Sequence, residues 1–292
     1  MTRIRQVAGR VGGRRGLALL LLSTIAAPAS LAPSPAAAVE TEATVAESIP
    51  APKLVRATPA LWEVRDADTT IYLFGTFHTL DGRTAWLDDR VRQAFDGSDE
   101  LVLETVVPAD NATVQSTAER EVVETSADGT RKLKPFMAGT RQAMNQGRAL
   151  GLSVEHGADA VLRRLAEDSG KPVGGLESFE DQLGQLARIP AQSASDANSE
   201  QPATVTLNEL LSAWSIGDTG AFSVMLQGFE AKAPVAYRML IADRNARWGQ
   251  WIADRLEQPG TVFLAVGTGH LAGKDSVQSW LAARGIESTR VG

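Results

Sequence analysis

The chain contains no cysteine and only three histidines. Without a thiol, disulfide bonds, thiolate metal ligands, cysteine nucleophiles and a lipid-modified N-terminal cysteine are all excluded. Any imidazole chemistry must involve His78, His156 or His270. Basic residues are also few, with 29 Lys and Arg against 35 Asp and Glu and a net charge of −6. A nucleic-acid partner is therefore not expected, because a broad binding face needs clustered Lys and Arg.

The N-terminal residues 1–38 are typical of a secretory signal peptide. A basic start without acidic residues precedes an apolar run at 17–27 and then Ala36-Ala37-Ala38, which fits an A-x-A cleavage site. A retained membrane anchor is the alternative, but this run is shorter than the ~20 residues of a spanning helix. The Arg14-Arg15 pair leaves open whether export is of the Sec or the twin-arginine type. We expect a periplasmic or secreted protein that meets the membrane only transiently, through its signal peptide.

The mature chain is more acidic than the precursor. Cleavage would remove five arginines and no acidic residue, which takes the net charge from −6 to −11. Residues 39–58 are rich in Ala, Pro, Glu and Thr without hydrophobic periodicity, and we interpret them as a disordered leader. One folded domain is then expected over 59–292.

Strand-like segments at both ends of this domain enclose a long helical middle. Short β-branched or aromatic runs predict strands at 61–64, 70–74, 100–107, 172–176, 261–266 and 286–291. Amphipathic patterns predict helices at 87–95, 135–150, 158–167, 179–187, 207–215, 221–227, 234–256 and 274–283. Residues 192–204 form a polar insertion that we place on the surface. The pattern favours an α/β fold: a single domain with a mixed β-sheet and a large helical middle section.

Two histidines follow the same strand-and-turn pattern. The segments IYLFGTFH and VFLAVGTGH both end in G-T-x-H, at His78 and His270. Glycine at a strand end permits a sharp turn with positive φ, and strand ends are where α/β proteins place functional groups. Two such imidazoles suit a divalent metal as ligands, or one can be a ligand and the other a general base. The alternative is that both are ordinary turn histidines.

Three charged residues join these histidines as site candidates. Glu104 lies in an apolar strand and would need a metal, a cation or hydrogen-bond donors, unless it faces solvent. With His78 and His270 it would complete a two-histidine, one-carboxylate set. Glu177 is either a further ligand or general base, or a carboxylate that interacts with a helix N-terminus. Arg244 either contacts substrate or forms a structural ion pair, and His156 lacks the motif and is interpreted as structural or surface-exposed.

Several segments resemble the TraB/PrgY/GumN family, which includes the animal Tiki proteins. They are LWEV, IYLFGTFH, LVLE, GKPVGGLESFEDQL, DRNARW and FLAVGTGHLAG, and the resemblance runs from Leu61 to Gly292. It implies a fold related to the erythromycin-esterase and haem-binding ChaN proteins. Tiki members are described as metal-dependent proteases, and the PrgY branch limits the activity of a peptide signal.

The family's site residues can be placed on this chain one by one. Its two GxxH histidines correspond to His78 and His270, its strand and GLE glutamates to Glu104 and Glu177, and the arginine of its RN pair to Arg244. The chain departs from the family at Asp243, where many members have Glu, and in the longer insertion at 192–204.

The hypothesis from the sequence is an exported metal-dependent hydrolase that acts on a peptide or protein substrate. His78, His270 and Glu104 would hold a divalent zinc, manganese, cobalt or iron ion, and Glu177 or another nearby carboxylate would take a proton from water. The alternative is a non-catalytic protein that sequesters a peptide, haem or a metal ion. A third possibility is a copy that has kept the fold and lost activity.

Overall fold

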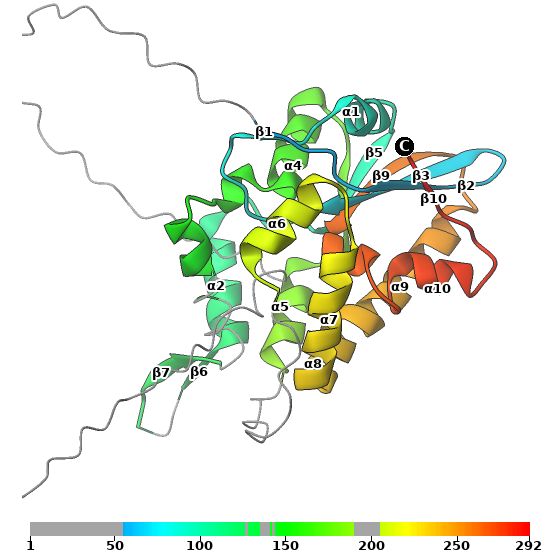
Figure 1. Ribbon diagram of the computed structural model, residues 1–292. Coiled ribbons are helices and arrows are strands. Elements are labelled where there is room, and N and C mark those ends of the chain that lie inside the picture. Colours follow the sequence, from blue (N-terminus) through cyan, green and yellow to red (C-terminus); the bar gives the residue numbers. More distant parts are fainter. Residues whose placement is uncertain (1–54, 126–127, 135–140, 142–143, 190–204) are drawn as a thin grey trace, which may run out of the picture.

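The β-branched and aromatic segments form the strands of one six-stranded sheet (Figure 1). The computed structural model describes residues 55–125, 128–134, 141, 144–189 and 205–292. In pairing order, the strands are β10 (Thr289–Arg290), β2 (Leu61–Arg65), β3 (Thr69–Thr76), β9 (Gly260–Gly267), β5 (Glu100–Thr105) and β8 (Val173–Glu177). The last four run parallel to one another, whereas β2 is antiparallel to both of its neighbours, β10 and β3. The prediction of a mixed α/β sheet is confirmed.

Side chains of the central strands are buried on both faces of the sheet. Along β9, Val262 and Leu264 pack in one apolar cluster, while Phe263 and Ala265 pack in the other. The first cluster includes residues of α9 (Asp243–Arg255) and α10 (Val277–Ala282), and the second those of α1 (Asp89–Asp96) and α4 (Ala158–Ser169). Helices on both faces are the usual cover of a parallel sheet, whose strands therefore lack a polar face.

The helical middle section packs near the end of β3. It comprises α5 (Phe179–Ala187), α6 (Leu207–Ser215), α7 (Gly220–Lys232), α8 (Pro234–Tyr237) and the π-helical turn η2 (Arg238–Ala242), which leads into α9. The ring of Phe77, just after β3, lies 5.8 Å from that of Trp214 in α6 and 6.5 Å from that of Phe222 in α7. The helix predicted at 234–256 is present, but it widens into a π turn at Arg238–Ala242, just before the helical turn that contains Arg244.

Some elements differ from the sequence-based expectation. Helix α2 (Asn111–Val122) and the hairpin of β6 (Val123–Thr125) and β7 (Arg131–Leu133) were not predicted. Helix α2 has a weakly amphipathic sequence, and its clearest signal is the N-cap Asp110, which accepts hydrogen bonds from two backbone N–H groups. The last predicted strand shortens to β10. Helix α10 begins three residues later than predicted, where Ser276 caps it.

The described part of the chain begins at residue 55, before the expected start of the domain at residue 59. Strand β1 (Val55–Arg56) pairs with β4 (Thr84–Ala85), and Ala57 is buried. The predicted signal peptide, most of the leader and the insertion at 192–204 lie outside the described residues, as does part of the helix predicted at 135–150, of which 141 and 144–149 are helical. Of the helices that the structure describes, none is long and apolar enough to span a bilayer.

Candidate functional site

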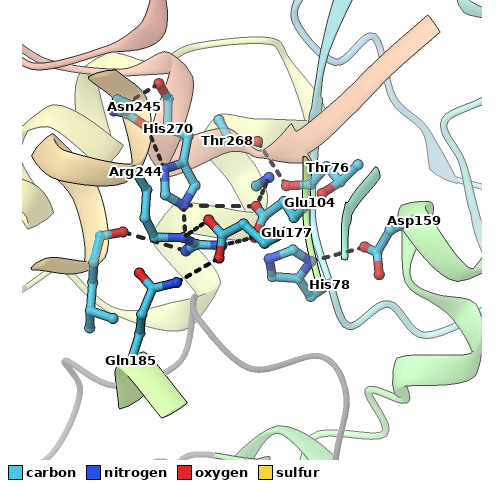
Figure 2. A network of polar contacts seen from close by, with 12 residues as sticks. Thr76, His78, Glu104, Asp159, Glu177, Gln185, Arg244, Asn245, Thr268 and His270 are labelled. Atoms are coloured by element: carbon cyan, nitrogen blue, oxygen red, sulfur yellow. Dashed lines mark hydrogen bonds and ion pairs between the residues drawn. The ribbon is translucent and has the colours of Figure 1, made fainter. Parts of the chain in front are cut away.

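The predicted site residues meet at one edge of the sheet (Figure 2). Because β3, β9, β5 and β8 are parallel, their carboxyl ends lie at the same edge, where α/β folds commonly bind ligands. His78 follows β3, Glu104 and Glu177 lie at the ends of β5 and β8, and His270 lies in the 3-10 turn η3 (Thr268–Leu271) after β9. The structure therefore brings together residues almost two hundred positions apart in the chain.

The two G-T-x-H units interlock. Strands β3 and β9 are neighbours, and the Thr268 hydroxyl donates a 2.9 Å hydrogen bond to the Thr76 carbonyl oxygen. A Cβ on Gly75 would lie 2.8 Å from the Thr268 hydroxyl oxygen, and a Cβ on Gly267 would lie 2.9 Å from His78 Nε2. Each glycine thus makes room for a side chain of the other unit.

The expected reason for these glycines was wrong. Neither Gly75 nor Gly267 has a positive φ, and the backbone at Gly267 has φ −53° and ψ 136°. Close approach between the two turns, rather than a left-handed conformation, requires a residue without a side chain.

This interlock predicts a contrast between two neighbouring glycines. A methyl group on Gly267 would also lie 3.1 Å from Glu104 Oε1, so Gly267→Ala should lower the free energy of unfolding by about 1–3 kcal/mol through overpacking. Gly269→Ala is the matched control, because a Cβ there has no neighbour within 4 Å. Urea unfolding of both variants measures the difference. Equal stabilities would contradict the interlock.

Glu104 is a buried carboxylate with defined partners on both oxygens. Its Oε1 accepts a 2.5 Å hydrogen bond from the Gly267 backbone N–H, and its Oε2 accepts one of 3.0 Å from Arg244 Nη2. Burial alone would raise the pKa of Glu104, but the neighbouring His270, Arg244 and His78 and the Gly267 hydrogen bond together lower it to about 2. Glu104 is therefore ionised and does not face solvent.

Arg244 connects the carboxylates to one histidine. Its guanidinium donates to Glu104, to Glu177 Oε1 at 2.6 Å and to His270 Nε2 at 3.2 Å, and it lies 4.5 Å from the Trp248 ring. The side chain is 2% exposed. The structural ion pair considered for Arg244 is thus present, while its contact with substrate stays a prediction.

Both oxygens of Glu177 also have partners. Arg244 binds Oε1, and the Gln185 amide donates a 3.1 Å hydrogen bond to Oε2. Its neighbour Ser178, rather than Glu177, caps the helix that follows. In this arrangement Glu177 helps to hold Arg244, and its role as ligand or general base stays a prediction.

His270 presents one ring nitrogen to the cluster. Its Nδ1 lies 2.6 Å from Asn245 Oδ1, and the Asn245 amide nitrogen donates to the carbonyl oxygens of His270 and Asp275. Because that amide group is the donor to both carbonyls, Oδ1 accepts and Nδ1 carries the proton. Burial lowers the pKa of His270 to about 3, since the opposing effect of Glu104 is outweighed. The neutral ring thus directs the Nε2 lone pair toward Arg244.

His78 is held by a carboxylate. Its Nδ1 lies 2.9 Å from Asp159 Oδ1, and its Nε2 faces Gly267 beside Glu104. Burial lowers the pKa of His78, but the charge and hydrogen bond of Asp159 and the charge of Glu104 outweigh this effect and raise it to about 9. In the arrangement described here, this imidazole is therefore protonated.

His78, His270 and Glu104 are residue types that bind divalent metals. Their present contacts nevertheless differ from those of a metal centre. In the described part of the chain, no three His, Cys, Asp or Glu residues are grouped so that they could hold a metal ion. His270 Nε2 and Glu104 Oε1 are nevertheless 3.8 Å apart, and two imidazoles with a carboxylate are common ligands of zinc and iron. Before a metal could bind, the hydrogen bond between Arg244 and His270 Nε2 would have to break. The single lone pair of Nε2 cannot bind the guanidinium and a metal ion at once.

The residues that orient the histidines were not predicted from the sequence. Asp159 and Asn245 were not singled out, although Asn245 stands next to Arg244 in the RN pair and Asp159 is the acidic residue in the first turn of α4. His156 is exposed and lies on the surface, in the 3-10 turn η1 (Val154–His156). Trp248 is buried in the core against His270, with ring centroids 4.4 Å apart.

Comparison with known proteins gives one family and two relatives. A model described as the TraB/PrgY/gumN family matches residues 60–130 and 105–290. The chain is similar to proteins named "Uncharacterized protein YbaP" of Escherichia coli (strain K12) and Shigella flexneri, with 27% identity over 140 residues in each case. The match covers 47% of this chain and 52% of each relative, so it spans about half the length of these curated proteins. No solved structure matches the chain.

Proposed function

The chain belongs to the TraB/PrgY/gumN family, and from that premise we propose that it is a metal-dependent hydrolase that cleaves peptide bonds. The main support is the cluster of two histidines and a glutamate at the carboxyl ends of neighbouring parallel strands. An outer partner contacts each of these side chains: Asp159 at His78, Asn245 at His270 and the Gly267 N–H at Glu104. Side chains held in this way can offer their remaining atoms to one ion.

The proposed ligands are His78 Nε2, His270 Nε2 and Glu104, and metal binding would have to displace the Nε2 proton of the protonated His78 ring. A divalent zinc, manganese, cobalt or iron ion at this set would lower the pKa of bound water. Glu177 Oε2 accepts from a neutral amide and retains a lone pair, so it is our proposal for the atom that takes a proton. Arg244, released from His270, would bind the carbonyl or carboxylate of a peptide substrate.

We further propose that the enzyme works in the periplasm or outside the cell. The support is the basic and then apolar sequence of residues 1–38, which ends in a small-residue cleavage pattern. Comparing the N-terminus of the protein from a periplasmic extract with that of the precursor tests this location.

Metal removal tests the activity. The purified protein, incubated with a peptide library, should cleave a subset of peptides, and a chelator should reduce cleavage to background. Readdition of zinc, manganese, cobalt or iron(II) should restore cleavage by at least one of the metals, because each suits the donor set. Cleavage that survives complete metal removal would overturn the metal-dependent mechanism.

The contacts of Arg244 also favour a second candidate function. Its guanidinium already binds both glutamates and the His270 lone pair, so the cluster is internally paired. Such a centre would suit a binding protein that sequesters a peptide, haem or a metal ion without turnover. A ligand that co-purifies with the protein and is retained, with no peptide cleaved under any metal condition, would support this alternative over the hydrolase.

A further inference from the structure

Two residues without an assigned role contact the outer nitrogens of the candidate histidines. Asp159 lies beside Nδ1 of His78, and Asn245 lies beside Nδ1 of His270 (Figure 2). They come from different elements, the first turns of α4 and α9. Each histidine thus has a hydrogen-bond partner at Nδ1, although the two partners come from unrelated segments of the sequence.

The N-terminus of α4 is docked directly on the turn that carries His78. The Ala158 N–H donates a 3.1 Å hydrogen bond to the Phe77 carbonyl oxygen. Gly157 approaches the His78 carbonyl so closely that a Cβ would overlap its oxygen. This contact, possible only for glycine, holds the first turn of the helix and therefore Asp159 at a fixed position beside the ring.

Asn245 is fixed by a different arrangement. Its amide nitrogen donates to the backbone carbonyls of His270 and Asp275, at 3.3 and 2.6 Å, and its side chain is buried. With the nitrogen committed to two acceptors, only the oxygen can face the ring. Asn245 therefore accepts the Nδ1 proton of His270 in one orientation.

We propose that Asp159 and Asn245 are positioning residues that hold His78 and His270 with a proton on Nδ1, so that both rings present Nε2 to the same point. The metal part of this inference rests on the proposed function, whereas the ring orientation does not. An outer hydrogen bond that fixes tautomer and orientation is the usual support of a metal-binding histidine, and its loss typically costs 10–100-fold in affinity.

The test uses proton NMR of the metal-free protein and zinc affinity by calorimetry. In the wild-type protein, hydrogen-bonded Nδ1–H resonances are expected from two rings, and the presence of only three histidines makes them assignable. Asp159→Ala should remove the His78 resonance alone, and Asn245→Leu the His270 resonance alone. Each variant should also bind zinc about 10–100-fold more weakly. Asp159→Asn, which retains an acceptor, should recover most of the lost affinity.

Asp89→Ala serves as the matched control, since Asp89 is an exposed acid in the first turn of another helix, α1. It should leave both resonances and the zinc affinity unchanged, and urea unfolding of every variant separates loss of fold from loss of orientation. Wild-type protein that shows both resonances but binds no zinc would overturn the proposed metal function and support the positioning role. Resonances that persist in Asp159→Ala and Asn245→Leu would overturn the inference, as would variant zinc affinities equal to a measurable wild-type affinity.

Discussion

Replacement of Arg244 by methionine is expected to lower the free energy of unfolding by about 3–5 kcal/mol. The guanidinium is 2% exposed and faces the carboxylates of Glu104 and Glu177, which are themselves 10% and 5% exposed. Methionine preserves much of the apolar volume but leaves two buried negative charges without their common partner. Removing one member of a buried ion pair is costly because the remaining charge stays desolvated. Urea unfolding of the wild-type and variant proteins measures the loss.

Arg247 supplies the control for this substitution. It lies in the same helix, one turn further on, and its Nη2 is 3.9 Å from Glu177 Oε1, but its side chain is 52% exposed, so solvent screens this contact. Arg247→Met should therefore change the free energy of unfolding by less than about 0.5 kcal/mol. The double variant Arg244→Met/Glu177→Gln removes one of the two unpaired buried carboxylate charges. Its loss in free energy of unfolding should therefore be smaller than that of Arg244→Met alone. If Arg244→Met were as stable as Arg247→Met, the buried charge network would not contribute to stability.

The local elements that carry the site could be predicted from the sequence. The run that ends at Phe74 and the run from Thr261 to Val266 are apolar and β-branched, and both became central parallel strands. The repeated G-T-x-H pattern identified the two turns. Each turn directly follows one of two strands, β3 and β9, that pair with each other. Local composition was sufficient here because each strand is buried on both faces.

The contacts between elements could not be predicted in the same way. That Gly267 lies against His78 depends on the pairing of β3 with β9, which places residues from opposite ends of the domain in register. Asp159 and Asn245 reach the histidines only after α4 and α9 have packed on the sheet. No spacing within a single segment encodes these contacts, so the sequence indicated the histidines and not the residues that orient them.

Substitution of either candidate ligand should abolish peptide cleavage. We expect His78→Ala and His270→Gln each to lower kcat/KM by about 10³-fold or more, beyond the 10–100-fold typical of the loss of an outer partner. His156→Ala is the control, because the third histidine is exposed and lies outside the cluster. Cleavage assays of the three variants, with urea unfolding to establish that each is folded, measure the effect. Wild-type activity in either His78→Ala or His270→Gln would contradict the proposed ligand set.

The double variant His78→Ala/His270→Gln distinguishes one shared site from two separate ones. Losses from residues that act at independent sites multiply, whereas residues that act as one unit are strongly non-additive. If both rings serve a single ion beside Glu104, the first substitution already disables the centre, and the second should lower the remaining rate by less than about tenfold. A double variant whose loss equals the product of the single losses would mean that the two turns meet without sharing a function.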